Sequence, residues 1–280
     1  FRSDGFAPDG RVKSKQARSM NPNTTDPHTG EKDRKTTTSF GYRQIAVDEK
    51  AGYVLRHFNS IAAQYDFMNT LLSLGIHYFW KRSAVKAARL KDGALVIDVC
   101  GGTGDLAMLA AKGIGARGRV IVYDINLAML KNGLPKIRKF ALDGQIACVQ
   151  GDAEVMAFPS DCFDAAMIGF GIRNVTHMET CLQEMYRVLK PEGRFMCLEF
   201  SLPVTPWFRF LYDFYSFCVM PVIGRLLVGN REAYLHLPES IRMFPSPDVF
   251  SRMVMEAGFG DVRYERLTNG IAVIYTGVKP

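Results

Sequence analysis

The sequence predicts an α/β domain built on a mostly parallel β-sheet, and three observations carry this prediction. Residues 95–99 form a short apolar run rich in β-branched side chains, which is typical of a strand buried on both faces. The glycine cluster Gly101-Gly102-Thr103-Gly104 follows directly, and a helix-like pattern begins at Leu106. A second apolar run over 119–123 ends in Asp124, about 20 residues after the last glycine. Strand, glycine turn, helix and strand in this order indicate a right-handed β-α-β unit.

The same alternation continues toward the carboxyl end. Candidate strands cover 94–99, 119–124, 146–151, 163–168, 193–199, 261–267 and 271–278, and candidate helices cover 104–113, 127–140, 177–189 and 247–257. Because only Thr268-Asn269-Gly270 separate the last two strands, these strands form a hairpin and the final one runs antiparallel. The sequence therefore predicts a Rossmann-like, mostly parallel seven-stranded sheet with a C-terminal antiparallel hairpin.

We expect a single domain over 39–280, with two helical additions. Residues 1–38 are polar and lack a hydrophobic period, which is typical of a disordered tail, and Met20 is a candidate start. Apolar residues recur at helical spacing after 50, so we predict an N-terminal helical cap over 44–90. The alternation breaks at 201–245, where a densely aromatic helical insert is predicted. This insert is either a helix pair packed on the sheet or an apolar lid that also touches a membrane.

Composition narrows the class of protein. Hydrophobic residues make up 48% and charged residues 22% of the chain, as in a soluble globular protein. The net charge of +7 is moderate and too diffuse to indicate nucleic acid, but it allows weak attraction to an anionic membrane. The six cysteines form no C-x-x-C pair, which favours a reducing compartment. The five histidines show no metal-ligand spacing, so we predict no metal, and no apolar run is long enough to predict a transmembrane helix.

The glycine cluster indicates a nucleoside-type cofactor. Glycines let the main chain approach a ligand closely, and the helix that follows presents free N–H groups. Asp124 at the end of the next strand is placed to accept both hydroxyls of a ribose. A dinucleotide loop would carry a third glycine at position 107, where this chain has Ala, and Asp98 lies within the preceding strand. A glycine turn without a ligand is the alternative.

In its D-x-x-G-G-T-G-D form, the loop resembles the first motif of the class I S-adenosylmethionine (SAM) methyltransferases. Taken together with this loop, further segments make the chain similar to the UbiE/MenG family of C-methyltransferases of ubiquinone and menaquinone biosynthesis, from about residue 40 to 279. The F-G-I-R-N-V and Y-D-x-M-N segments are the most particular of these. The segments that carry the resemblance are 64–69, 73–77, 101–105, 151–154, 158–159, 170–175, 187–191, 198–201 and 239–242.

The resemblance implies SAM as the methyl donor, without a metal, and it assigns binding positions. Asp124 matches the ribose-binding acid, and Asp152 with Ala153 matches the pair that binds adenine. Thr103 matches a loop contact, and Gly169 matches a position that is serine in some relatives, so only its main chain is available here. The full set of expected cofactor-binding residues is Asp98, Gly101, Gly102, Thr103, Gly104, Asp124, Asp152, Ala153 and Gly169.

The resemblance also implies that the acceptor is a ring carbon of a reduced, polyprenylated quinol, because a quinone carbon is electron-poor. An adjacent ring hydroxyl, with a reference pKa near ~10, must lose its proton. Arg173 and Asn174, just after the fourth strand, are the catalytic candidates. Arg173 remains protonated, so it stabilises a phenolate or polarises a water, and a structural salt bridge is its alternative role. The side chains expected to line the substrate are Tyr65, Phe210, Phe214 and Phe217.

The implied setting is a membrane surface. We expect transient membrane contact, no nucleic acid, and a homodimer or a quinone-biosynthesis complex. The location would be the cytoplasm, peripheral to the inner membrane, in a bacterium, or the matrix side in a mitochondrion. The alternative functions are a non-catalytic SAM-binding partner, a methyltransferase for another apolar small molecule, an RNA methyltransferase and an NAD-dependent oxidoreductase. The sequence leaves open whether the ring is a benzoquinol or a naphthoquinol, the length of the tail and the proton acceptor.

Overall fold

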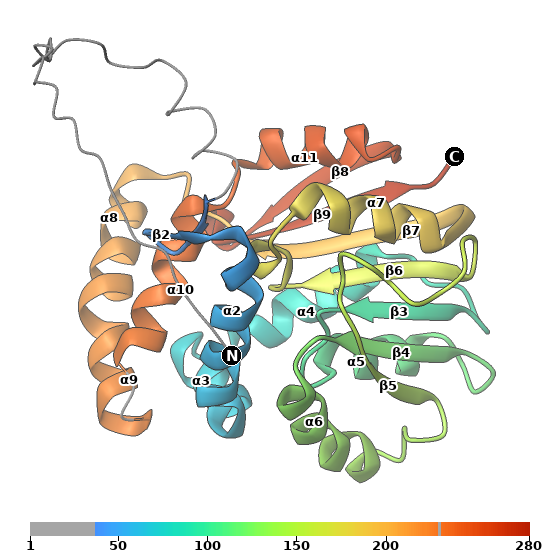
Figure 1. The fold of residues 1–280 in the computed structure, drawn as a ribbon, viewed down its shortest axis with the longest axis horizontal. Coiled ribbons are helices and arrows are strands. Elements are labelled where there is room, and N and C mark those ends of the chain that lie inside the picture. Colours follow the sequence, from blue (N-terminus) through green and yellow to red (C-terminus); the bar gives the residue numbers. More distant parts are fainter. Residues whose placement is uncertain (1–36, 229–230) are drawn as a thin grey trace, which may run out of the picture. The chain divides into compact units, whose positions relative to one another are not determined.

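A seven-stranded sheet is the frame of the protein in the computed structural model, which describes residues 37–228 and 231–280 (Figure 1). The strand order is β5-β4-β3-β6-β7-β9-β8. β9 runs opposite to the other six strands, which all point the same way. This arrangement confirms the predicted fold class, including the final hairpin. The strands are β3 (Leu95–Val99), β4 (Arg119–Asp124), β5 (Ile146–Gln150), β6 (Phe163–Gly169), β7 (Leu189–Phe200), β8 (Gly260–Leu267) and β9 (Ala272–Val278).

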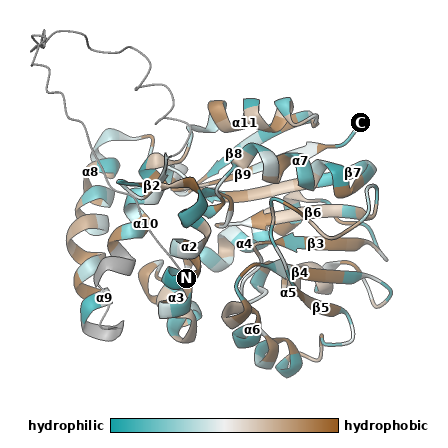
Figure 2. Ribbon diagram, viewed as in Figure 1, coloured by the Kyte–Doolittle hydropathy of each residue, from teal (hydrophilic) through white to brown (hydrophobic). Residues whose placement is uncertain are grey.

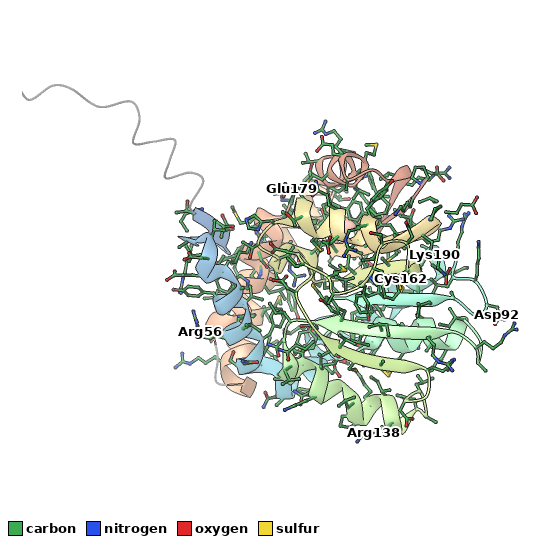
Figure 3. All side chains as sticks on the ribbon, turned by 45° about the vertical axis from the view of Figure 1, so that its right-hand side comes forward. Arg56, Asp92, Arg138, Cys162, Glu179 and Lys190 are labelled. Atoms are coloured by element: carbon green, nitrogen blue, oxygen red, sulfur yellow. The ribbon has the colours of Figure 1, made fainter. Side chains whose placement is uncertain are left out.

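Helices cover both faces of the sheet because alternate strand residues point to opposite sides. Val96 packs in one apolar cluster, with α4 (Ile76–Ala87), α5 (Asp105–Gly113) and α6 (Leu127–Lys139). Its neighbour Ile97 packs in the other, with α7 (Met178–Val188) and α11 (Pro247–Glu256). Figure 2 shows apolar colouring along the central strands between these layers. Figure 3 shows charged side chains such as Arg56, Asp92 and Arg138 projecting from the periphery.

The N-terminal helical cap is present, but it begins with an element that the sequence did not predict. Residues 37–46 form a small hairpin of β1 (Thr37–Phe40) and β2 (Arg43–Ala46). Thr37 and Thr38, assigned to the tail from the sequence, therefore lie in a strand, and residues 1–36 lie outside the described residues. The helices of the cap are α2 (Lys50–Ile61), α3 (Tyr65–Leu72) and α4, with short 3-10 turns at 47–49 and 62–64.

The insert after β7 is helical, as predicted. It contains α8 (Pro206–Phe214), a π-helical segment η4 (Tyr215–Val219), α9 (Met220–Val228) and α10 (Arg231–Met243). Met220 packs with Ile61, Met68 and Leu72 of the cap in a third apolar cluster. Figure 1 shows the insert and the cap beyond the carboxyl ends of the parallel strands. Among the described helices, none combines the length and the hydrophobicity needed to cross a bilayer.

Close packing of α6 on the glycine cluster leads to a stability prediction. A Cβ added at Gly133 would lie 2.7 Å from the Thr103 carbonyl oxygen, and that main-chain atom has no room to yield. We therefore expect Gly133→Ala to destabilise the protein by about 1–3 kcal/mol, as overpacking does. A thermal melt, supported by denaturant titration, measures the change.

Gly113→Ala is the matched control, because the same substitution in α5 meets open space. Its effect is expected to be neutral or slightly stabilising, by less than about 1 kcal/mol. If both variants melted at the wild-type temperature, the close contact between α6 and the glycine cluster would be refuted.

Candidate functional site

Two adjoining cavities open at the carboxyl ends of the parallel strands, where α/β sheets bind ligands. We call the first the loop cavity; its volume is about 310 Å³ and the glycine cluster forms part of its wall. We call the second the apolar cavity; its volume is about 350 Å³ and it lies between the cap and the insert. The two cavities share part of their lining. The shared residues are Phe58, Tyr65, Lys81, Phe170 and Asn174.

The glycine cluster forms one wall of the loop cavity, and its backbone requires glycine. Gly102 has a φ of +55°, in the left-handed region that side chains disfavour. A Cβ at Gly101 would lie 2.8 Å from the carbonyl oxygen of Asp98. Gly101, Gly102 and Thr103 line the cavity, as expected. Gly104 does not; it caps α5 with a φ of +79° and packs toward Ile137, so its role is to turn the chain.

Asp124 lies at the tip of β4 and faces the loop cavity. Its Oδ2 accepts a hydrogen bond from the Gly102 N–H at 2.9 Å, and its Oδ1 accepts one from the Asn126 N–H at 2.7 Å. Burial raises the pKa of this carboxyl, while the two N–H donors favour the ionised form. An ionised carboxylate accepts about four hydrogen bonds, so both oxygens keep capacity for hydroxyl groups.

Asp98 presents a buried carboxylate oxygen to the same cavity. Its Oδ2 accepts the Ala107 N–H at 3.0 Å, whereas its Oδ1 has no partner among the described residues. Burial, with a smaller contribution from the nearby Asp124 charge, raises the pKa of Asp98 to about 7. A buried acceptor without a partner is costly unless a ligand satisfies it. The chemistry that suits it is a cationic donor such as an ammonium group.

The opposite wall contains the remaining predicted binding positions. Asp152 and Ala153 line the loop cavity next to Gly151, and Asp152 Oδ1 accepts the Glu154 N–H at 2.9 Å. Gly169 also lines the cavity, and a Cβ there would lie 2.4 Å from the Leu106 side chain. A larger residue at this position would therefore need Leu106 to move.

A charged network joins the cap to the glycine cluster. The Thr103 hydroxyl donates to Asp66 Oδ1 at 2.7 Å, so this side chain serves the cap. Lys136 Nζ lies 2.7 Å from Asp66 Oδ2 and 2.5 Å from Asp105 Oδ1, and Lys81 Nζ lies 2.6 Å from Asp105 Oδ2. Burial opposes ionisation of Asp105, but the two ammonium groups outweigh it and hold its pKa at about 2. The network fixes α3 and α4 against the loop cavity.

This network and Asn126 were not predicted from the sequence. Asn126 caps α6 by accepting the Met129 N–H, and its Nδ2 donates to Asn59 Oδ1 of α2 at 3.0 Å. An Asn before a helical pattern is an N-cap signal, so the capping role of Asn126 could have been predicted from the sequence. Its contact with α2, 67 residues earlier, was not.

Arg173 lies at the wall of the apolar cavity and is also held in an ion pair. Its Nη1 donates to Glu199 Oε1 at 2.7 Å and to the Phe170 carbonyl oxygen at 2.5 Å. Its Nε reaches Ser240 Oγ at 3.4 Å, and among the described residues its Nη2 has no hydrogen-bond partner. The structural and the catalytic roles expected for Arg173 are therefore compatible. Nη1 and Nε fix one edge of the guanidinium, and Nη2 makes no hydrogen bond within the described residues.

Asn174 belongs to the wall between the two cavities and has a side chain that can donate hydrogen bonds. Its side chain lines both of them. Its Nδ2 is buried, and within the described part of the chain it has no hydrogen-bond partner. A buried amide that donates to nothing is expensive in isolation, so its N–H groups are available to a ligand oxygen.

The apolar cavity corrects the predicted substrate contacts on α8. Tyr65 lines it as expected, but Phe210, Phe214 and Phe217 do not. Phe210 and Phe214 are exposed, and Phe217 lies beneath the Arg242 guanidinium. The expected residues and the residues that line the cavity recur at the same helical spacing, but the two sets lie on faces about 200° apart around the helix axis. From α8, η4 and α9, the residues that line the cavity are Phe208, Leu211, Tyr212, Tyr215, Ser216 and Met220, and α10 adds His236, Leu237, Pro238, Ser240 and Ile241.

Two histidines of the apolar cavity were also missed. His236 stacks on Phe40 of the unpredicted hairpin with ring centroids 3.9 Å apart, and His57 packs edge-on against His236. Burial lowers the pKa of His57 to about 4 and that of His236 to about 3, so both are neutral at pH 7. Across the described residues, no cluster of histidine, cysteine and acidic side chains is arranged to hold a metal ion.

Comparison with solved structures identifies the fold. A SAM-dependent methyltransferase from Aquifex aeolicus superposes with a TM-score of 0.52 at 17% identity, over 71% of this chain and 89% of that one. A SAM-dependent methyltransferase from Thermotoga maritima gives a TM-score of 0.56 at 18% identity, over 81% of this chain and all of the other. At these identities the likeness shows the fold alone, which is that of the class I SAM methyltransferases.

Sequence comparison is far more specific. The chain is 46% identical over 245 residues to the ubiquinone/menaquinone biosynthesis C-methyltransferase UbiE of Photorhabdus laumondii, covering 88% of this chain and 98% of that protein. It is 44% identical over 248 residues to the UbiE of Pseudomonas savastanoi pv. phaseolicola, covering 89% and 97%. The family model described as "ubiE/COQ5 methyltransferase family" matches residues 38–279. The predicted resemblance is confirmed, and the chain is a member of the ubiE/COQ5 family of methyltransferases.

Proposed function

We propose that this protein transfers the methyl group of SAM to a ring carbon of a reduced, polyprenylated quinol in ubiquinone or menaquinone biosynthesis. In chemical terms, it would convert a demethylmenaquinol to a menaquinol, or methylate a 2-polyprenyl-6-methoxy-1,4-benzoquinol. The names of the relatives support this proposal. The observation that carries it is the shared wall, because the loop cavity and the apolar cavity meet at Phe58, Tyr65, Lys81, Phe170 and Asn174.

The loop cavity fits the donor. Its unpartnered Asp98 Oδ1 is suited to the ammonium of the methionine part, and Asp124 to the ribose hydroxyls. Asp152 and the Ala153 main chain are suited to the adenine. The bound donor supplies an activated methyl group, which is transferred in line and needs no further electrophilic assistance. The protein has only to place the acceptor carbon and favour its electron-rich form.

The apolar cavity fits the acceptor. Its lining is mostly aromatic and aliphatic, and its histidines are neutral at pH 7 because burial lowers their pKa. A ring hydroxyl near Arg173 would lose its proton more readily, because the guanidinium stabilises the phenolate. In the described part of the chain, the Nη2 group of Arg173 and the Nδ2 group of Asn174 have no hydrogen-bond partner, and both residues line this cavity. They would hold the oxygens of the ring while the methyl group is transferred to its carbon.

The tail of such an acceptor places the reaction at a membrane. A polyprenyl chain is insoluble in water and remains in the bilayer, so the enzyme has to reach the ring from the membrane surface. We therefore propose peripheral association with the membrane that holds the quinone pool. In a bacterium this would be the cytoplasmic face of the inner membrane.

Asp124→Ala is expected to weaken SAM binding at least tenfold. Charge-assisted hydrogen bonds to a carboxylate contribute about 1.5–3 kcal/mol each, and about 1.4 kcal/mol is tenfold in affinity. Titration calorimetry measures the affinity, and Asp92→Ala, which removes an exposed carboxylate from the far side of the sheet, is the control. An affinity within twofold of wild type would rule out Asp124 as the ribose ligand.

Arg173→Lys is expected to keep SAM affinity and to lose at least nine-tenths of kcat on a reduced quinol. Lysine retains the positive charge but not the planar fork, of which Nη1 pairs with Glu199 while Nη2 has no hydrogen-bond partner among the described residues. Steady-state kinetics and a melting curve are recorded together, with Arg138→Lys at the periphery as the control. An unchanged kcat would leave Arg173 with its structural role alone.

The raised pKa of Asp98 predicts a pH dependence of SAM binding. Below about pH 7 the free protein holds Asp98 protonated, and a neutral carboxyl attracts an ammonium group poorly. SAM affinity should therefore fall as the pH is lowered from 7.5 toward about 5.5. In Asp98→Asn the affinity should be weak and nearly independent of pH over this range. A variant that kept the wild-type slope would assign the dependence to another group.

A further inference from the structure

The α8–α9 stretch presents a row of large apolar side chains to solvent. The exposed fractions are 65% for Trp207, 73% for Phe210 and 57% for Phe214, and Leu211 and Val222 are also more than half exposed. These residues recur at helical spacing, so they lie along one side of the helix. A contiguous exposed apolar row of this kind is unusual on a protein without a partner and marks an interaction surface.

A second exposed apolar group lies on the turn between α3 and α4 and on the first residues of α4. Leu74 is 89% exposed, and its φ of +49° is one that leucine rarely adopts. Ile76, Tyr78 and Phe79 are also exposed. The turn packs close to the insert, because the Tyr215 hydroxyl donates to the Leu72 carbonyl oxygen at 2.7 Å. The two groups, which come from distant parts of the sequence, are therefore neighbours.

The apolar cavity opens between these two groups. Leu74 and Ile76 from the turn, and Leu211 from α8, line the cavity and are exposed to solvent. They form the rim of its mouth. A second copy of the chain seated on this surface would cover the mouth, whereas a bilayer would supply it with the apolar tail of a substrate.

The charges on the helices that carry the two exposed apolar groups favour an anionic partner. The two carboxylates of α3 and α8, Asp66 and Asp213, are in ion pairs with Lys136 and Arg242. The charged side chains left exposed on α3, α4, α8 and the described part of α9 are all basic: Arg82, Lys86, Arg209 and Arg225. Aromatic and aliphatic side chains bordered by arginine and lysine are typical of surfaces that lie in the headgroup region of a membrane.

We propose that the α8 row and the α3–α4 turn together form a docking surface for an anionic phospholipid bilayer, with the mouth of the apolar cavity against the membrane. The aromatic side chains enter the headgroup region, and the four basic side chains pair with lipid phosphates. This inference rests on the proposed function, because a prenylated acceptor would enter from the lipid phase through the mouth.

Flotation of the full-length protein with lipid vesicles tests the docking surface without any quinol. The vesicles contain either phosphatidylcholine alone or equal parts of phosphatidylcholine and phosphatidylglycerol. Wild type should float with the mixed vesicles, and less so at high salt, because screening weakens the basic contribution. The variant Trp207→Ser with Phe210→Ser and Phe214→Ser should lose at least nine-tenths of this binding.

The matched control replaces three exposed apolar residues elsewhere, Phe140, Val249 and Met255, with serine, and it should float like wild type. Since all six positions are exposed, both triple variants should melt near the wild-type temperature. The α8 variant should keep SAM affinity and turnover of a water-soluble, short-tailed quinol. A failure of the proposed function would appear as no turnover of any quinol by wild type, whatever the vesicles show.

Two results would overturn the docking surface. One is wild-type flotation of the α8 variant. The other is a wild-type dimer in light scattering that this variant dissociates, because the row would then be an interface between copies of the chain.

Discussion

The contact between the cap and the glycine cluster is the constraint on which the rest of the site depends. Both cavities depend on it, because α2, α3 and α4 line each of them, opposite the sheet edge in the loop cavity and opposite the insert in the apolar cavity. Apolar packing alone would let the cap slide over the sheet. The bonds from Thr103 and Lys136 to Asp66 of α3, and from Lys81 of α4 to Asp105, fix its position, since hydrogen-bonded ion pairs are directional. Thr103 therefore contributes to the loop cavity mainly by holding the cap in place.

The site carries polar groups that folding alone would not retain. Asp98 Oδ1 and Asn174 Nδ2 are buried without a partner in the described residues, and each is less stable there than in water. Both line the loop cavity, and Asn174 also lines the apolar one. Buried polar groups without hydrogen-bond partners are expected to cluster at functional sites, where a ligand completes the hydrogen bonds. By contrast, Arg173 is fixed by Glu199 on one edge, so its guanidinium keeps one orientation.

The sheet could be predicted from the sequence because its signals are local. Buried parallel strands are continuous apolar runs, and the short connection between β8 and β9 permits only a hairpin. The same applies to the glycine cluster, whose conformation depends on residues within it. The β1–β2 hairpin lacks such a signal: Thr37–Phe40 is short and polar, and it is stabilised by the stacking of Phe40 on His236, which lies far away in the sequence. Its existence depends on tertiary contacts.

The insert shows where periodicity stops being informative. Aromatic residues occur on every side of α8, so the spacing of Phe210, Phe214 and Phe217 is as regular as that of Phe208, Leu211 and Tyr215. The inward face is selected by the cap, through Leu72 and the third apolar cluster. Likewise, the Thr103 hydroxyl is directed by Asp66, 37 residues earlier in the chain. Sequence patterns locate such residues at the site, and the three-dimensional packing decides what their side chains do.

In the proposed reaction, a methyl group passes from the loop cavity to a reduced ring in the apolar cavity. The most direct test is a single-turnover experiment under anaerobic conditions with methyl-labelled SAM and one short-tailed acceptor, supplied either as the quinol or as the quinone. The account predicts label on a ring carbon of the quinol and essentially none on the quinone. Equal labelling of both forms, or no labelling of the quinol by protein that binds SAM, would contradict it.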